Sequence, residues 1–218
     1  MNNLLILEKY RKISEEGRVA YSAGVVKPFI GFPDSAKKRL DISVGFDSAS
    51  TRIIKERVLR PLSDNSLGIS SMQAVRDFPL HTTILGGENI VEISNRPEWL
   101  SLLTTRVSKI LVGREICFDR LIADTKGTVM LAATNISEYI LSARAFVTEA
   151  YIREGIKVIP LDNILHSAQI RVRSFSLGQM APWAAISSLD STIRYSPIKV
   201  CISEVYSGPL YSFLTQLQ

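Results

Sequence analysis

The sequence alternates between short segments with a period of two residues and longer segments with a helical period. In LDISVGF (residues 40–46), apolar residues alternate with polar or small ones, which predicts a half-buried strand. Residues 97–111 instead repeat apolar side chains at intervals of three and four behind Pro97, which predicts a helix. A chain that mixes the two periods in this way is expected to fold into strands and helices of one α+β domain.

The order of the predicted elements divides this domain into two similar lobes. Each half combines strands with a helix and carries one strand that contains a histidine. The expected elements are strands at 40–46, 78–85, 115–124, 127–134, 164–172 and 196–207, and helices at 51–60, 97–111, 136–154 and 182–190. Ser50 and Pro61 are expected to begin and end the first of these helices, and Asn135 and Gly155 to cap the third.

The N-terminal segment differs from the rest of the chain in its composition. Residues 3–16 have a helical pattern, and the residues that follow them are rich in Gly, Pro and Lys. We therefore expect residues 1–38 to form an N-terminal extension, a helix plus a loop, on a single domain that covers residues 39–218.

The composition is that of a globular protein, with 46% hydrophobic and 22% charged residues. A formal charge of +5 suits an anionic ligand such as a phosphate or an RNA end, although an ordinary solvated surface explains it more simply. Cys117 and Cys201 form no metal or redox motif. The sequence lacks a signal-peptide pattern and any apolar run of about 18 residues, so a cytoplasmic protein without a membrane partner is expected.

Both histidines of the chain lie in strand-like runs, FPLHTTIL (78–85) and NILHSAQI (163–170). Residues two apart share a face of a strand, so His81 belongs with Thr83 and His166 with Ala168. Two histidines that face one cleft can exchange protons with water and with a leaving oxygen near neutral pH. Such chemistry needs no metal or other cofactor. From the residues alone, the alternative that each histidine is simply satisfied by its neighbours stays open.

The pattern F-x-L-H-x-T-x-L, followed by helix, strand, strand and helix and then by L-H-S-A-Q-I-R, resembles the two-histidine (2H) phosphoesterase superfamily. This superfamily includes the RNA 2′–5′ ligases/cyclic phosphodiesterases, and the similarity covers roughly residues 39–218. The resemblance implies a bilobal fold in which two antiparallel sheets line a central cleft, with helices outside. It also implies that His81 and His166 are the catalytic acid–base pair and that Thr83 binds phosphate.

The second motif departs from the family pattern. Ala168 stands where the family has Thr or Ser, and Gln169 stands where it has a hydrophobic residue. Ser167 and Arg171 are further candidates for phosphate binding, because a hydroxyl or a guanidinium group suits phosphoryl oxygens. Strict alternation, however, puts both on the face away from His166 unless the strand bulges or twists.

The expected function is that of a metal-independent phosphodiesterase that hydrolyses 2′,3′-cyclic phosphates or 2′–5′-linked nucleotide or RNA ends. RNA ligation is the same chemistry in reverse. Because of Ala168, a non-catalytic nucleotide- or RNA-binding module with the same fold is the alternative, and a structural protein with silent histidines is a third. Tyr195 and Tyr206 are candidates for stacking on a base. The sequence predicts no oligomeric state.

Overall fold

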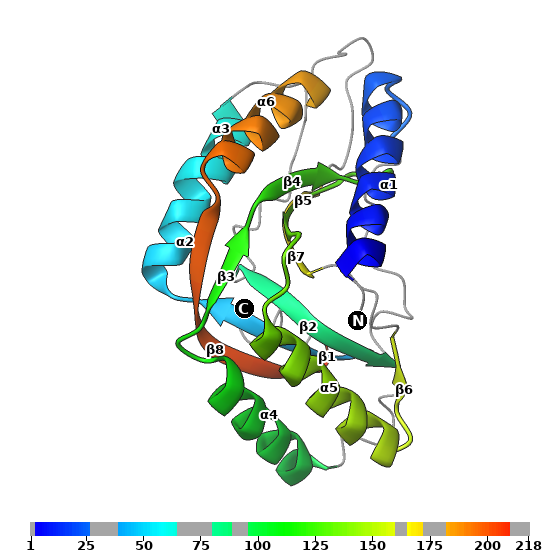
Figure 1. The fold of residues 1–218 in the computed structure, drawn as a ribbon, viewed down its shortest axis with the longest axis vertical. Helices are drawn as coiled ribbons and strands as arrows, with labels where there is room; N and C mark the ends of the chain where they lie inside the picture. The colour runs from blue at the N-terminus through cyan, green and yellow to red at the C-terminus, as the bar shows by residue number, and fades with distance from the viewer. Residues whose placement is uncertain are drawn as a thin grey trace.

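The chain folds into two antiparallel sheets with helices packed around them, so the predicted α+β class is confirmed (Figure 1). The computed structural model describes residues 3–26, 39–64, 80–88, 96–159, 165–171 and 182–209. Its elements are α1 (Asn3–Ser22), β1 (Arg39–Phe46), α2 (Ser48–Ile54), the π-helical η2 (Lys55–Leu59), α3 (Arg60–Asp64), β2 (His81–Glu88), α4 (Pro97–Leu111), β3 (Glu115–Phe118), β4 (Arg120–Ala123), β5 (Thr128–Ala133), α5 (Glu138–Arg153), β6 (Lys157–Val158), β7 (Leu165–Arg171), α6 (Pro182–Tyr195) and β8 (Ile198–Pro209). No described helix is long and apolar enough to cross a membrane.

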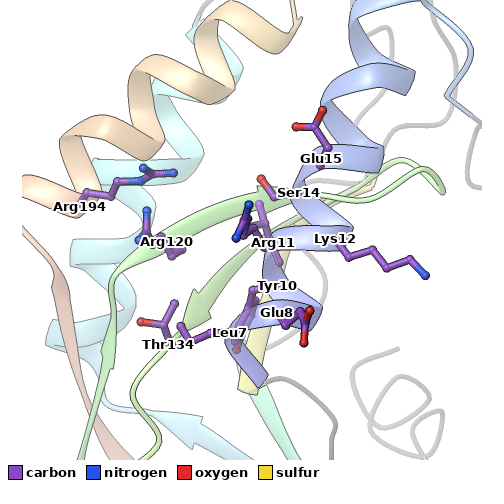
Figure 2. A pocket seen from close by; sticks show the side chains of 11 residues that line it. Leu7, Glu8, Tyr10, Arg11, Lys12, Ser14, Glu15, Arg120, Thr134 and Arg194 are labelled. Carbon is purple, nitrogen blue, oxygen red and sulfur yellow. The ribbon is translucent and has the colours of Figure 1, made fainter. Parts of the chain in front are cut away.

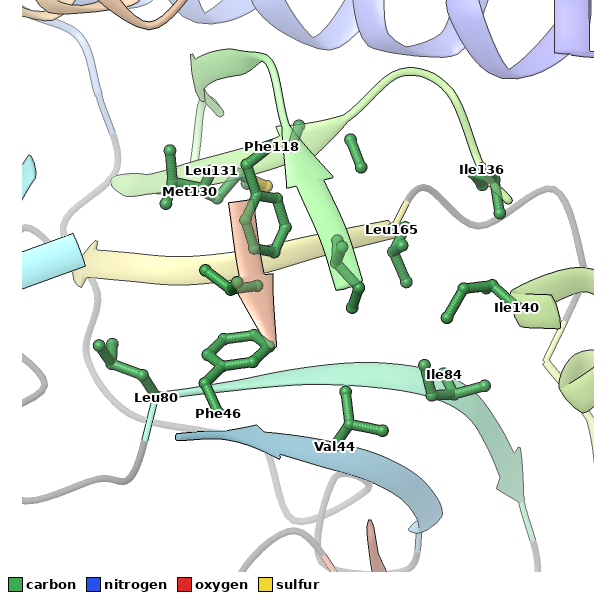
Figure 3. Close-up of a cluster of buried hydrophobic side chains, with 14 of the residues drawn as sticks. Val44, Phe46, Leu80, Ile84, Phe118, Met130, Leu131, Ile136, Ile140 and Leu165 are labelled. Carbon is green, nitrogen blue, oxygen red and sulfur yellow. The ribbon is translucent and has the colours of Figure 1, made fainter. Parts of the chain in front are cut away.

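The two sheets have the strand orders β3-β8-β1-β2-β6 and β4-β5-β7. Strands β2 and β7, which carry the two histidine motifs, belong to different sheets but contact each other. They run in opposite directions, and Leu165 of β7 lies above Ile84 of β2 (Figure 3). The fold therefore brings together two segments that are far apart in the sequence.

One apolar core extends across both sheets and the helices that pack on them. Val44, Phe46 and Ile84 of the five-stranded sheet point toward Leu131 and Leu165 of the three-stranded sheet (Figure 3). Helix α4 packs on β8 and α5 packs on β2, whereas α1 and α6 pack on β4. The five-stranded sheet thus has an apolar side toward this core, and its other side carries polar residues of β1 and β2.

Helix α1 is longer than the sequence predicts. The pattern predicts a helix over residues 3–16, whereas α1 continues past Gly17 to Ser22. At Gly17 the helix approaches β4 so closely that a Cβ atom would lie 1.9 Å from the carbonyl oxygen of Ala123. The buried Tyr10 hydroxyl lies 2.9 Å from the carbonyl oxygens of both Ala133 and Leu165, and its one hydrogen is shared between them. Helix α1 is therefore seated on the three-stranded sheet. The domain boundary at residue 38 stays a prediction, since residues 27–38 lie outside the described ranges.

The helix after β1 does not end where the sequence predicts. Pro61 lies inside α3, because the π-helical turn before it changes the hydrogen-bond pattern and Arg60 N–H donates to the carbonyl of Lys55. The N-cap is Asp47, whose carboxylate accepts a 2.7 Å bond from Ser50 N–H. The Ser50 hydroxyl instead accepts a 2.8 Å bond from Cys201 N–H of β8, so it joins the helix to the sheet.

Candidate active site

The polar side of the five-stranded sheet carries the first histidine motif. Val44 and Phe46 face the core, so Ser43 and Gly45 belong to the opposite side of β1. The register of β8, β1 and β2 arranges polar residues in two adjacent rows on this side. The rows are Glu204–Gly45–His81 and Tyr206–Ser43–Thr83. This places His81 and Thr83 together, as the sequence predicts.

The hydroxyl of Thr83 is held in place by a neighbour that the sequence analysis did not single out. Thr83 Oγ1 and Ser43 Oγ lie 3.2 Å apart, and either can donate the hydrogen bond. Ser43 is buried, whereas Thr83 is half-buried and His81 beside it is also half-buried. The pair thus fixes one hydroxyl next to an accessible imidazole. The signal for Ser43 in the sequence was its place among the polar positions of LDISVGF.

Gly45 makes room for Tyr206 beside His81. A Cβ atom at Gly45, which lies directly opposite His81, would be 2.6 Å from the hydroxyl oxygen of Tyr206. The tyrosine ring therefore crosses β1 above the glycine. Burial and the neighbouring Glu204 carboxylate raise the pKa of Tyr206, so its hydroxyl keeps its proton at neutral pH. Tyr195, the other tyrosine considered for stacking, is 93% exposed in α6.

A buried carboxylate lies one row further along the same face. Asp41 is 1% exposed, and its Oδ1 accepts a 3.0 Å bond from Arg39 Nη2. Its Oδ2 has no hydrogen-bond partner among the described residues. Burial raises the pKa of Asp41, and the positive charges of Arg39 and His81 offset part of that rise. Asp41 is therefore an electrostatic neighbour of His81.

The raised pKa of Asp41 leads to a pH-dependent stability. A folded-state pKa above the unfolded value means that the carboxyl group favours folding while it is protonated, and that this contribution is lost as pH rises through the folded pKa. Asp41→Asn stays neutral at every pH. Its free energy of unfolding, relative to the wild type, is thus expected to rise as the pH increases above about 4, where an ordinary aspartate loses its proton. Urea denaturation of both proteins across this range measures the difference. A difference that does not change with pH would contradict this account.

The second motif lies in β7, whose backbone register the structure describes, whereas the side chains of residues 166–171 lie outside that description. His166 is opposite Ala132, Ser167 opposite Leu131 and Ala168 opposite Met130. A bulge at Gln169 then brings Arg171 opposite Thr128. Thr128, Met130 and Ala132 alternate onto one side of β5. The bulge therefore gives Arg171 a register position on the same side of β5 as His166, which strict alternation did not predict.

The bulge does not change the register position of Ser167, because Ser167 comes before the bulge in β7. It remains opposite Leu131, whose side chain faces the shared core. Among the described residues, no three His, Cys, Asp or Glu side chains come together in a way that could hold a metal ion. The described part of the site thus consists of His81, Thr83 and Ser43 with the Tyr206–Glu204 pair beside them, on a strand that contacts β7.

The buried Arg144 of α5 supports the strand on which the site is built. It is 2% exposed, and its Nε–H donates a 2.8 Å hydrogen bond to the carbonyl oxygen of Ile84. Ile84 is the extra residue of a bulge in β2, since Thr83 pairs with Ser43 and Leu85 with Ile42. The guanidinium group therefore satisfies a backbone carbonyl where the ladder of β2 is interrupted, directly after Thr83.

No model of a known protein family matches the sequence, and no curated protein matches it either. Among solved structures, the chain is similar to Usb1 of Kluyveromyces marxianus, with 13% sequence identity and a TM-score of 0.37. The match covers 82% of this chain and 100% of the other. A likeness of this size is too distant to support an assignment, so the function has to be argued from the site itself.

Proposed function

We propose that this chain is a phosphodiesterase that opens 2′,3′-cyclic phosphates or cleaves 2′–5′-linked nucleotide or RNA ends, with His81 and His166 as its acid–base pair. The observation that carries the proposal is the polar face of β2. There, a half-buried histidine shares a side of the strand with a hydroxyl that is held by a second hydroxyl. This strand contacts β7, which carries the other histidine of the chain.

The proposed reaction transfers two protons. One histidine takes a proton from water as the water oxygen attacks phosphorus, and the other gives a proton to the 2′-oxygen as its bond to phosphorus breaks. Thr83 donates a hydrogen bond to a phosphoryl oxygen, and Ser43 fixes its orientation. Arg171 is the preferred phosphate ligand from β7, because of its register position, and Ser167 is the weaker candidate.

Thr82 and Thr83 offer a matched pair of variants to test this proposal. Thr83→Val removes the hydroxyl of the polar face and is expected to reduce kcat/KM for a 2′,3′-cyclic nucleotide about tenfold, as one lost hydrogen bond to a charged group does. Thr82 is fully buried, and its hydroxyl has no partner among the described residues. Thr82→Val is therefore expected to leave turnover unchanged and to raise the free energy of unfolding by about 1 kcal/mol.

The measurement is the initial rate with 2′,3′-cyclic and 2′–5′-linked substrates in the presence of EDTA, together with urea denaturation. The two valine variants also separate the activity of this protein from that of a contaminating nuclease, which neither substitution would affect. Absence of wild-type turnover on all these substrates would overturn the phosphodiesterase proposal. If Thr83→Val then still weakened the binding of a nucleotide, the alternative of a non-catalytic binding module, motivated by Ala168, would replace it.

A further inference from the structure

A second candidate site is a pocket of about 820 Å³ between α1, α6 and β4 (Figure 2). Four basic side chains line it, against two acidic ones. Figure 2 shows the guanidinium groups of Arg11, Arg120 and Arg194 around the same space, each from a different element. The basic residues are Arg11, Lys12, Arg120 and Arg194, and the acidic ones are Glu8 and Glu15.

Two of these arginines have no acidic partner among the residues that the structure describes. Glu15 is bound by Arg18, with a 2.9 Å bond from Arg18 Nε, and Arg194 is paired with Asp190 at 2.6 Å. Within the described part of the chain, Arg11 and Arg120 form no ion pair. Two guanidinium groups beside one pocket repel each other unless an anion lies between them. Because their planar forks suit phosphate oxygens, the pocket is suited to a phosphate group.

The pocket is close to the strand that carries the second histidine. Arg120 of β4 is opposite Ala132 of β5, and Ala132 is opposite His166 of β7. Strands in a sheet are about 4.8 Å apart, so the backbones of Arg120 and His166 are separated by roughly 10 Å. Tyr10, which also lines the pocket, reaches the carbonyl oxygen of Leu165, the residue before His166.

We propose that Arg11 and Arg120 bind a backbone phosphate of an RNA strand whose end is held at the histidine site. This inference rests on the proposed function, because the pocket would bind the part of the RNA chain that precedes the reacting end. Helix α1, which supplies Arg11, would then give the enzyme a preference for RNA ends over mononucleotides. The volume of the pocket is that of sites which hold small ligands of nucleotide size.

The test compares a 2′,3′-cyclic mononucleotide with a short oligoribonucleotide that ends in a 2′,3′-cyclic phosphate. Arg11→Gln/Arg120→Gln is expected to raise KM for the oligonucleotide about tenfold or more and to leave the mononucleotide KM unchanged. Its KM for the oligonucleotide should also depend less on salt. The matched control is Arg106→Gln/Arg153→Gln, which removes two charges from α4 and α5 and is expected to change neither KM. Arg11→Lys/Arg120→Lys, which keeps the charge, should recover part of the oligonucleotide affinity.

Fluorescence anisotropy with a labelled, uncleavable oligoribonucleotide separates this inference from the proposed function. If the wild type binds the oligonucleotide and the double glutamine variant does not, the proposed binding of RNA by Arg11 and Arg120 is supported, even where neither protein shows turnover. Equal binding by both proteins would overturn it. An equal rise in KM for the mononucleotide would also overturn it, because the two arginines would then serve the reacting end and not the strand.

Discussion

Replacing His81 with alanine is expected to lower kcat for a 2′,3′-cyclic substrate by about 100-fold or more, since a positioned acid or base contributes a factor of about 10² to 10⁴. His166→Ala is expected to have an effect of the same order. Initial rates with EDTA present measure both. Because His81 is half-buried on the polar side of β2, its removal is expected to change the free energy of unfolding by less than about 1 kcal/mol.

The pH dependence of the two variants assigns their roles. In the wild type, kcat/KM is expected to rise and then fall with pH, because one histidine acts without its proton and the other with it. The variant that lacks the base should lose the rising, low-pH limb, and the variant that lacks the acid should lose the falling limb. Turnover by His81→Ala at the wild-type rate would contradict the proposed mechanism, as would the loss of the same limb in both variants.

Much of the fold could be predicted because its signals are local. The alternation of LDISVGF predicted β1 to within one residue, and Pro97 marks the first residue of α4 as expected. The element boundaries that were predicted wrongly depend on contacts with residues outside the helix or strand itself. Asn135 has capping-box spacing to Glu138, yet α5 begins at Glu138 after Ser137. The second strand was expected to end at residue 85, but β2 continues through two glycines to Glu88, and Gly87 packs closely on Tyr151 and Ile156.

The candidate site was predictable only in part, for a similar reason. His81 and Thr83 share a face through simple alternation, and the structure agrees. Ser43 and Tyr206 join them only through the register of three strands, which no single segment specifies. The bulge at Gln169 changes the register position of Arg171 in the same way. Bulges depend on packing between strands, as Arg144 shows by donating to the carbonyl of Ile84 in the bulge of β2.

The N-terminal helix gives the clearest difference between sequence pattern and packing. Taken alone, the Gly-, Pro- and Lys-rich composition after residue 16 predicts that the helix ends there. The structure continues α1 through Gly17, and the absence of a side chain is what allows the helix to approach Ala123 of β4. Glycine in a helix costs about 1 kcal/mol relative to alanine. That cost is offset here by close contact with the sheet.

Gly17→Ala is therefore expected to destabilise the protein, although helix propensity alone predicts that it stabilises α1. The new Cβ would lie 1.9 Å from the carbonyl oxygen of Ala123, so α1 would have to move away from β4. That movement would also disturb the hydrogen bonds of Tyr10 and the burial of Tyr21. A net loss of about 3 kcal/mol in the free energy of unfolding is expected, at the upper end of the cost of overpacking.

Thermal and urea denaturation measure this effect, and Glu16→Ala is the matched control. Glu16 is the neighbouring residue on α1, and its side chain is 55% exposed with a 4.0 Å ion pair to Lys12, so its replacement is expected to change stability by less than about 1 kcal/mol. In a chain of this length, a loss of 3 kcal/mol corresponds to a fall in Tm of roughly 6–12 °C. If Gly17→Ala were as stable as the wild type or more stable, helix propensity would outweigh packing at this position. In that case α1 would not lie as close to β4 as it does in this structure. The position of Arg11 at the pocket between α1, α6 and β4 would then be contradicted as well.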